Sequence, residues 1–302
     1  MIVDKLQNSE PIIGYRLQSS VANNSIIFEA EYNCTTVPLI ADHKVYNVVV
    51  IPGSFHIART ISAITKVFNT SNCCLTEISF ENAIILHNEN ESRTVQLCLH
   101  TDGQHDSFEI ISIIDNNKII NGTGKIKLPT APDIPRINLQ HLQNICNQEV
   151  SVLEYQRDLV KDRYQYGPGY IWVEQVWRDG SQALGKMRAP TTAELKQELA
   201  LQPGLIDCSF QVISACFTNI KSILSDIDVA YIPIGIEVFN LYSRPTTDLW
   251  CHVTVVPGIS PSSKVLRADI ELIAANGDVV VQMLGFTAMQ APSAALFKSV
   301  KK

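Results

Sequence analysis

Apolar and polar residues alternate in the same order in the two halves of the chain, which predicts two similarly built halves. In the first half, Ser25–Tyr32 has the pattern of a strand, and the Pro52-Gly53 step opens a helix. Alternating runs follow this helix, as is typical of antiparallel strands. The positions that carry the pattern are Ile57, Ile61, Ile64 and Phe68 in the helix, and Val95, Leu97, Leu99, Ser107–Asp115 and Lys118–Leu128 in the strands.

The second half repeats this order. Tyr170–Arg178 is predicted to be a strand, and Pro203-Gly204 opens a second helix. Long alternating runs follow, and Asn276-Gly277 is a hairpin signal between the last two of them. The apolar helix positions are Phe210, Ile213, Phe217, Ile220 and Leu224, and the predicted strands are Ala230–Tyr242, Leu249–Val255, Arg267–Ala274 and Val279–Met289.

Both predicted helices are apolar and carry few charges, so each should be buried. A buried helix wrapped by a curved antiparallel sheet, present twice, is a double hot-dog fold of the α+β class. The stretch Leu128–Pro135 holds three prolines and indicates an extended linker. We therefore expect an N-terminal half at 1–128, a linker at 129–150 and a C-terminal half at 151–302. The alternative is a pair of unrelated α+β domains.

Composition narrows the function classes. The 302 residues are 46% hydrophobic and 18% charged, which excludes a disordered or fibrous chain. A net charge of −6 argues against a protein that binds nucleic acid through a basic face. We find no apolar run of the roughly 18 residues that span a membrane and no signal peptide, so we expect a cytoplasmic protein. The eight cysteines show no C-x-x-C or zinc spacing, and we expect no metal site.

Two residues are candidates for acid–base chemistry. His43 lies nine positions before Pro52, and Asp207 lies four positions after Pro203. Taken alone, such a histidine is more often structural, and such an aspartate is more often a helix cap. The two halves are complementary, however, because His56 stands where the first half would match Asp207, and Glu194 stands where the second half would match His43.

If the halves face each other, one composite site with one histidine and one aspartate results. A base and an acid on opposite sides of a tunnel suit an elimination: the imidazole removes a proton α to a carbonyl, and the carboxyl protonates the departing hydroxyl. Backbone N–H groups at the start of the Gly53 helix are placed to polarise the carbonyl oxygen.

The position of Asp207 and its expected role favour different protonation states. A carboxyl near a helix N-terminus tends to stay ionised, whereas a general acid must carry a proton. Either the apolar neighbours Leu205, Ile206 and Phe210 favour the neutral form by desolvation, or His43 performs both proton transfers and Asp207 orients the hydroxyl.

Three motifs in register resemble the signatures of polyketide synthase dehydratase domains. His43-x3-Asn47-x4-Pro52 resembles their H-x3-G-x4-P motif, Tyr164-Gln-Tyr166-Gly167-Pro168-Gly-Tyr170 resembles Y-G-P-x-F/Y, and Pro203-x3-Asp207-x3-Gln211 resembles P-x3-D-x3-Q/H. Pro11-Ile-Ile-Gly14 is similar to their P-L-L-G opening. The order and spacing agree along nearly the whole chain.

The resemblance implies a double hot-dog hydro-lyase that removes water from a β-hydroxyacyl thioester to give an α,β-enoyl thioester. The substrate would arrive on the phosphopantetheine arm of an acyl carrier protein, with no resident cofactor. His43 would be the base and Asp207 the acid or hydroxyl anchor. Tyr166 and Gln211 would support them, and we expect both to help place Asp207 by hydrogen bonding. Asn47, Pro52, Gly53, Gly167 and Pro168 are expected around the substrate tunnel. Neighbouring synthase domains and a homodimer are the implied partners.

The resemblance leaves two other functions open. Relatives on this scaffold shift a double bond or close a pyran ring, and a silent domain would only hold its neighbours in a megasynthase. The presence of both Asp207 and Pro52 favours dehydration. Asn47 stands where the motif has glycine, and we expect it to be tolerated, because asparagine adopts a positive φ at low cost.

Overall fold

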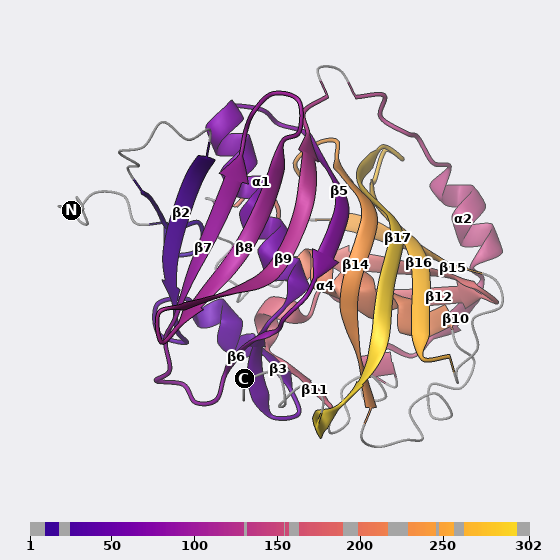
Figure 1. The fold of residues 1–302 in the computed structure, drawn as a ribbon. Helices are drawn as coiled ribbons and strands as arrows, with labels where there is room; N and C mark the ends of the chain where they lie inside the picture. Colours follow the sequence, from indigo (N-terminus) through magenta and orange to yellow (C-terminus); the bar gives the residue numbers. More distant parts are fainter. Residues whose placement is uncertain are drawn as a thin grey trace.

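Strands from both halves of the chain form one long antiparallel sheet, with helices α1 (Gly53–Phe68) and α4 (Pro203–Val212) behind it in the view of Figure 1. The computed structural model describes residues 10–17, 25–129, 132–153, 155–156, 163–189, 199–216, 229–245, 248–256 and 263–294. Within these residues the sheet has thirteen strands, and a second sheet has four.

The N-terminal half contributes two groups of strands. The long sheet runs in the order β1-β2-β7-β8-β9-β5 through this half, and β3, β4 and β6 belong to the four-stranded sheet. Besides α1 there is a 3₁₀ helix at Pro38–Asp42. The strands are β1 Tyr15–Arg16, β2 Ser25–Tyr32, β3 His43–Val45, β4 Val48–Ile51, β5 Cys73–Phe80, β6 Ile84–Leu86, β7 Arg93–His100, β8 Ser107–Ile114 and β9 Asn117–Lys127.

The C-terminal half continues the same sheet in the order β14-β17-β16-β15-β13-β12-β10, and β11 completes the small sheet beside β3. Its strands are β10 Gln148–Val150, β11 Tyr164–Tyr166, β12 Val173–Asp179, β13 Gln182–Arg188, β14 Val229–Leu241, β15 Asp248–Val255, β16 Val265–Ala274 and β17 Val279–Pro292. Among its described residues, further helices are α2 Leu139–Ile145 and the 3₁₀ helices Pro168–Tyr170 and Ile213–Cys216.

The two halves are joined edge to edge by β5 and β14, which pair from Leu241 opposite Cys73 to Gly235 opposite Ser79. Behind this join, α1 and α4 contact each other. The apolar faces of both helices are buried, as their hydrophobic spacing predicts. Together these contacts bring the first turns of the two helices to the same place between the halves.

A buried charge on α1 was not expected from its apolar pattern. Arg59 has no exposed surface and donates hydrogen bonds to the backbone carbonyls of Ile13, Phe28 and Val95. Its guanidinium also lies 5.3 Å from the centre of the Tyr32 ring. Carbonyl oxygens and an aromatic face thus replace part of the water that the cation loses, although Nη1 has no hydrogen-bond partner.

Most predicted strands agree with the structure to within three residues. The expected strand Tyr170–Arg178 starts later, at Val173, because Tyr170 belongs to the 3₁₀ helix after Pro168. In the described part of the expected second helix, α4 ends at Val212 and continues as a 3₁₀ helix to Cys216. Phe217, Ile220 and Leu224 lie outside the described residues.

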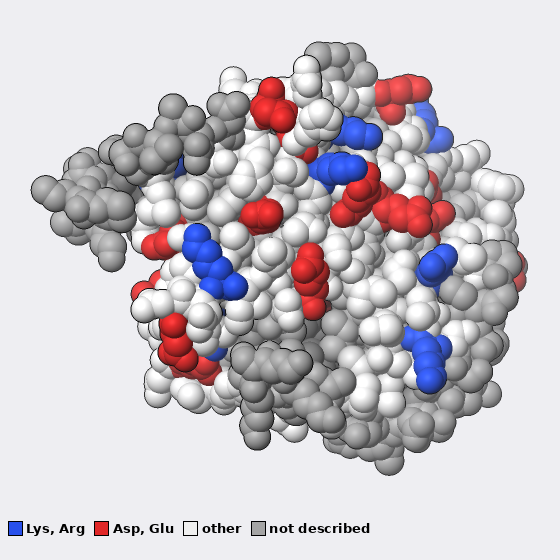
Figure 2. All heavy atoms as spheres, viewed as in Figure 1, with Lys and Arg blue, Asp and Glu red and all other residues white. Residues whose placement is uncertain are grey.

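The expected linker at 129–150 contains regular elements after its proline-rich part. Its proline-rich part has no regular structure at the described positions, but α2 and β10 follow, and β10 pairs with β12. The boundaries at 128 and 150 stay a prediction. Figure 2 shows acidic and basic side chains interspersed over the described part of one face. Among the described residues, no helix is both long and apolar enough to cross a membrane.

Candidate active site

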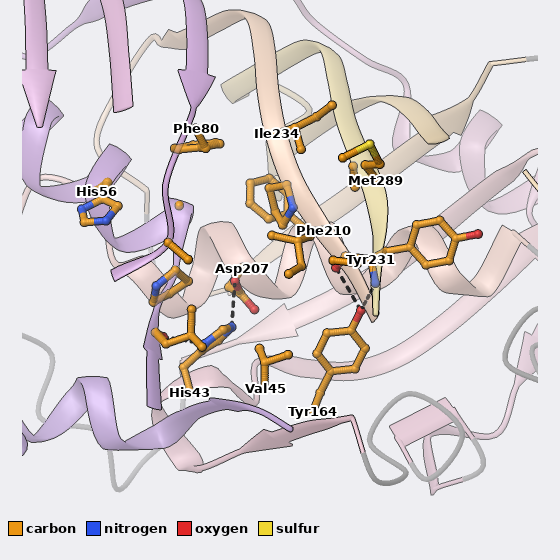
Figure 3. Close-up of a pocket in the computed structure, with 18 of the residues that line it drawn as sticks. His43, Val45, His56, Phe80, Tyr164, Asp207, Phe210, Tyr231, Ile234 and Met289 are labelled. Atoms are coloured by element: carbon orange, nitrogen blue, oxygen red, sulfur yellow. Dashed lines mark hydrogen bonds and ion pairs between the residues drawn. The ribbon is translucent and has the colours of Figure 1, made fainter. Parts of the chain in front are cut away.

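A cavity of about 390 Å³ lies between the two halves, and residues of both halves line it. Its walls come from β3, β4 and the start of α1 on one side, and from α4, β14 and β17 on the other. The walls are largely apolar, with Val45, Phe80 and Phe210 among them. His43 and Asp207 face each other across this space (Figure 3).

His43 is held in one orientation by its own hairpin. It begins β3, is 6% exposed, and its Nδ1 lies 2.9 Å from the carbonyl oxygen of Val50 on β4. A carbonyl only accepts, so Nδ1 carries the proton and donates. The lone pair of the neutral ring is therefore on Nε2, which lies 3.9 Å from Oδ1 of Asp207.

The turn of this hairpin explains the spacing of the first motif. Tyr46 and Asn47 have φ values of 52° and 63°, as a two-residue hairpin turn requires. The turn sets Val45 opposite Val48, and the same register brings Val50 opposite His43. The expected positive φ at Asn47 is confirmed. Asn47 is exposed, however, and does not line the cavity as expected, because it lies at the far tip of the hairpin.

Asp207 is bound by side chains from both halves. Its Oδ1 accepts a hydrogen bond from Ser54 Oγ at 3.1 Å, and its Oδ2 accepts one from Gln211 Nε2 at 3.0 Å. It does not cap α4, whose N-cap is Gln202 and whose start has no side-chain cap. With 6% exposure, this carboxyl is buried at the cavity wall, which excludes the helix-cap interpretation.

Tyr166 lines the cavity but does not hydrogen-bond Asp207, contrary to expectation. Its ring lies 5.5 Å from that of His43, which faces it across the β11–β3 pair. Burial, with the charge of Asp207, raises the pKa of its hydroxyl well above the usual value. Tyr166 is therefore a neutral hydroxyl beside the two candidate groups, and Ser54 takes the place expected for it at the carboxylate.

Gly167 and Pro168 support the site from outside the cavity. Neither lines it, contrary to expectation. The N–H of Gly167 donates to the backbone oxygen of Asp42, and the N–H of Gly169 donates to the Asp42 carboxylate. A Cβ at Gly167 would lie 2.0 Å from that carboxylate, so glycine permits the close approach. Because Asp42 precedes His43, this motif anchors the start of β3.

A second close approach positions α4. A Cβ at Gly204 would lie 1.8 Å from the carbonyl oxygen of Gly169, so only glycine lets the helix start here. Pro52 and Gly53 line the cavity, as expected. Pro52 is the N-cap of α1 and no side chain caps this end, which leaves the first N–H groups of the helix available to an oxygen in the cavity.

Two further residues adjoin the reacting pair, and only Tyr170 belongs to a motif noted in the sequence. Ser54 is the second residue of α1 and is fully buried, and the Tyr170 ring lies 5.2 Å from that of His43. Both are contacts between residues far apart in the chain. His56 also lines the cavity, whereas Glu194 lies outside the described residues.

Comparisons with known proteins agree with this site. Residues 10–113 match the family model described as "Polyketide synthase dehydratase domain", and residues 135–298 match "Polyketide synthase dehydratase N-terminal domain". Polyketide synthase PksN of Bacillus subtilis is 22% identical over 82% of this chain, and the phthioceranic/hydroxyphthioceranic acid synthase of Mycobacterium tuberculosis is 21% identical over 91%. The chain spans only 5% and 13% of the lengths of these two relatives.

Solved structures share the fold. The dehydratase domain from the CurJ module of curacin polyketide synthase superposes with a TM-score of 0.83 at 28% identity, covering 95% of this chain and 99% of that one. A histidine-to-phenylalanine variant of the CurJ dehydratase is described as an inactive mutant. The fold is the expected double hot dog of the α+β class. With family models matched on both sides of the site, the chain belongs to the polyketide synthase dehydratase family.

Proposed function

We propose that this domain removes water from a β-hydroxyacyl thioester and yields an α,β-unsaturated thioester. The observation that carries the proposal is the approach of His43 Nε2 to within 3.9 Å of the Asp207 carboxylate in a buried, largely apolar cavity. An elimination needs a base at the α-carbon and a group that handles the departing β-hydroxyl, and the two carbons are adjacent in the substrate. A short gap between the two side chains suits that geometry.

His43 removes the α-proton. The Val50 carbonyl holds the proton on Nδ1, which leaves the Nε2 lone pair directed at the cavity. When Nε2 takes the proton, the ring becomes an imidazolium whose Nδ1–H still donates to Val50, so no reorientation is needed. The uncapped start of α1 at Gly53 is the place where backbone N–H groups stabilise the charge that develops on the thioester oxygen.

Asp207 binds the β-hydroxyl. Ser54 and Gln211 each occupy one of its oxygens, and this fixes the carboxyl plane relative to His43. The proton that converts the hydroxyl to water comes either from protonated Asp207 or from the His43 imidazolium. Both routes balance, since one proton leaves the α-carbon and one joins the hydroxyl, so the pair needs no redox partner and no resident cofactor.

Delivery on an acyl carrier protein follows from the same proposal. Some residues that line the cavity, Glu81, Asn82 and Met289 among them, are exposed, while the reacting pair is buried. A long, thin tether such as phosphopantetheine can carry a thioester from the surface to such a site. The relatives are much longer than this chain, which matches only a small part of their length, and this supports neighbouring synthase domains. We propose a cytoplasmic location for them. We also propose the homodimer that the resemblance implies.

The test is dehydration of a panel of β-hydroxyacyl pantetheine thioesters, with the products resolved by position and geometry of the double bond. We expect turnover by the parent, and losses of at least ~10² for His43→Phe and Asp207→Asn without a change in melting temperature. His141→Phe and Asp248→Asn, at exposed positions, are the matched controls. Full activity of the folded His43→Phe variant would exclude the proposed base. A product with a shifted double bond or a ring would assign the isomerase or cyclase function instead.

A further inference from the structure

His56 is a polar residue of the cavity that the proposed elimination does not use. It stands three residues after Gly53 on α1, as Asp207 stands three residues after Gly204 on α4. Its ring lines the cavity, and its exposure is 4%. In Figure 3, His56 and Tyr164 lie on opposite sides of the His43–Asp207 pair, so His56 is set apart from the reacting atoms.

The imidazole of His56 lacks the partners that a buried polar group normally has. Its Nδ1 is enclosed by protein atoms and has no hydrogen-bond partner. Buried polar atoms without partners are rare, and each is costly, because the group has given up its hydrogen bonds to water. His43, the other histidine of the cavity, has its Nδ1 satisfied by the Val50 carbonyl. The cost at His56 therefore needs a reason.

The ring is neutral. Burial and, to a lesser extent, the nearby Arg59 cation lower the pKa of His56 to about 3. A neutral imidazole has one N–H donor and one lone pair. Since an orphaned buried N–H is rarer than an orphaned acceptor, the lone pair belongs on the enclosed Nδ1 and the proton on Nε2. A molecule in the cavity then meets the ring through Nε2–H, which is a donor.

We propose that His56 selects acyl chains that carry an oxygen atom, by donating a hydrogen bond from Nε2–H to a hydroxyl, ether or carbonyl oxygen of the chain. The inference rests on the proposed function, because it assumes that an acyl chain occupies the cavity. Phe80, which also lines the cavity, is apolar and would accept an unsubstituted chain equally well. His56 therefore adds selectivity that the apolar walls do not have.

The experiment is an ether scan of the substrate. β-Hydroxyacyl pantetheine thioesters of one chain length are prepared with a single methylene replaced by oxygen at successive positions. An ether oxygen has nearly the size of a methylene and only accepts hydrogen bonds, so it reports on a donor without changing shape. For the parent, we expect one position at which kcat/KM exceeds that of the all-carbon thioester by about 10-fold.

Two variants connect this preference to His56. His56→Phe keeps a ring but has no donor, and it should lose the preference while it still dehydrates the all-carbon thioester and melts at an equal or higher temperature. His56→Gln retains an N–H₂ near the position of Nε2 and should restore part of the preference. A role in packing alone would change all thioesters by the same factor in both variants.

Two outcomes would overturn the inference: a parent without any favoured oxygen position, or a preference that survives in His56→Phe. If the parent dehydrates none of the thioesters, the proposed function fails, and the inference is then judged by the dissociation constants of the same thioesters. Tighter binding of one ether by the parent but not by His56→Phe would support His56 as an oxygen-recognising residue, and equal dissociation constants would contradict it.

Discussion

At the scale of single residues, Asp207 shows how a carboxyl far from its partner in sequence is oriented. Ser54 on α1 and Gln211 on α4 donate to different oxygens of the carboxylate, so each half of the chain controls one of them. Gln211 is on the same helix as Asp207 and moves with it. Ser54 therefore sets the position of Asp207 relative to the half that carries His43.

We expect Ser54→Ala to lower kcat by about 10-fold, because the carboxyl loses one of its two positioning hydrogen bonds. Ser62→Ala is the matched control: Ser62 is also buried on α1, but its hydroxyl bonds the Ala58 carbonyl and the Ala200 N–H, away from the cavity. Both variants should lose some stability, and only Ser54→Ala should lose turnover. Equal losses of kcat would show that Ser54 acts only through packing.

The φ of 63° at Asn47 leads to a second prediction. Asn47→Gly should retain stability and turnover, because both residues accept this conformation. Asn47→Val should be destabilised by about 1–2 kcal/mol and should lower turnover, because strain in the turn shifts Val50 from His43. Urea unfolding and a turnover assay on the two variants decide. A sharp gain in activity for Asn47→Gly would mean that the amide obstructs the site.

His56 also predicts a pH dependence of stability. The unfolded residue binds a proton near pH 6.5, whereas the folded one, with its pKa lowered to about 3, does not. Protons thus favour the unfolded chain as the pH falls below 6.5. Between pH 6.5 and 4.5 the parent should lose about 2 kcal/mol more unfolding free energy than His56→Phe. Urea melts at the two pH values measure this, and parallel losses in both proteins would contradict it.

The site residues that could be predicted are those that stand at a characteristic spacing from a nearby motif residue. His43, Asp207 and Gln211 stand at fixed distances from Pro52 and Pro203, and the structure brings all three together. Ser54 could not be found this way, because nothing in the sequence relates position 54 to position 207. Tyr166 was assigned to Asp207 only by resemblance, and the register of β11 places its ring beside His43 instead.

At the scale of secondary-structure elements, the hairpin β3–β4 depends on a tie to the long sheet. Tyr46 lies in the turn of this hairpin. Its hydroxyl donates to the Ala291 carbonyl at 2.8 Å and accepts from the Ala230 N–H at 2.6 Å. Nearby, Tyr164 of β11 donates to the backbone oxygen of Tyr231 and accepts from its N–H. Two tyrosine hydroxyls therefore hold the sheet that carries His43 against β14 and β17.

We expect Tyr46→Phe to cost about 1–3 kcal/mol, because the buried N–H of Ala230 is left without an acceptor. Turnover should also fall, since the hairpin loses part of its anchorage. The control is Tyr15→Phe, which removes a hydroxyl that bonds Glu29 on β2, far from the hairpin, and should leave turnover unchanged. Thermal melts and kcat values for the pair test this. Unchanged turnover in Tyr46→Phe would show that β3 is held by its strand pairs alone.

Long elements could be predicted and short ones could not. β2, β7, β8 and β14 are eight or more residues long, which leaves enough positions for an apolar pattern to be recognised. β3, β4, β6 and β11 have three or four residues, too few to show a period, and only pairing with one another defines them. These short strands form the sheet that carries His43. His43 itself could therefore be predicted from the sequence, but the strands that position it could not.

At the scale of the whole molecule, the halves are held together by the β5–β14 pair and the contact between α1 and α4 rather than by the chain that connects them. These contacts join residues that are far apart in the sequence. They could be expected only from the inference that the two halves face each other. The continuous sheet itself was not predicted, because β5 was not recognised as a strand. The site is thus a property of the interface between the halves.

This arrangement predicts that the covalent connection is dispensable after folding. A protease site inserted between residues 128 and 135 of the full chain should be cleavable without loss of turnover. The cleaved protein should elute at the size of the intact one, and it should separate into two fragments only in denaturant. The uncleaved insertion variant is the control. Separation of the fragments in buffer would show that the linker region contributes to holding the halves.

Ser54 and Asp207 lie on different halves, so the site can form only after the two halves have docked during folding. Hairpins such as β7–β8 and β8–β9 close over short stretches of chain, whereas β5 must find β14 with more than half of the molecule between Cys73 and Leu241. Contacts so distant in sequence form late, because the intervening chain must first lose its freedom. During refolding from urea, circular dichroism should recover before catalysis does, and the delay between the two signals is the time the halves need to dock.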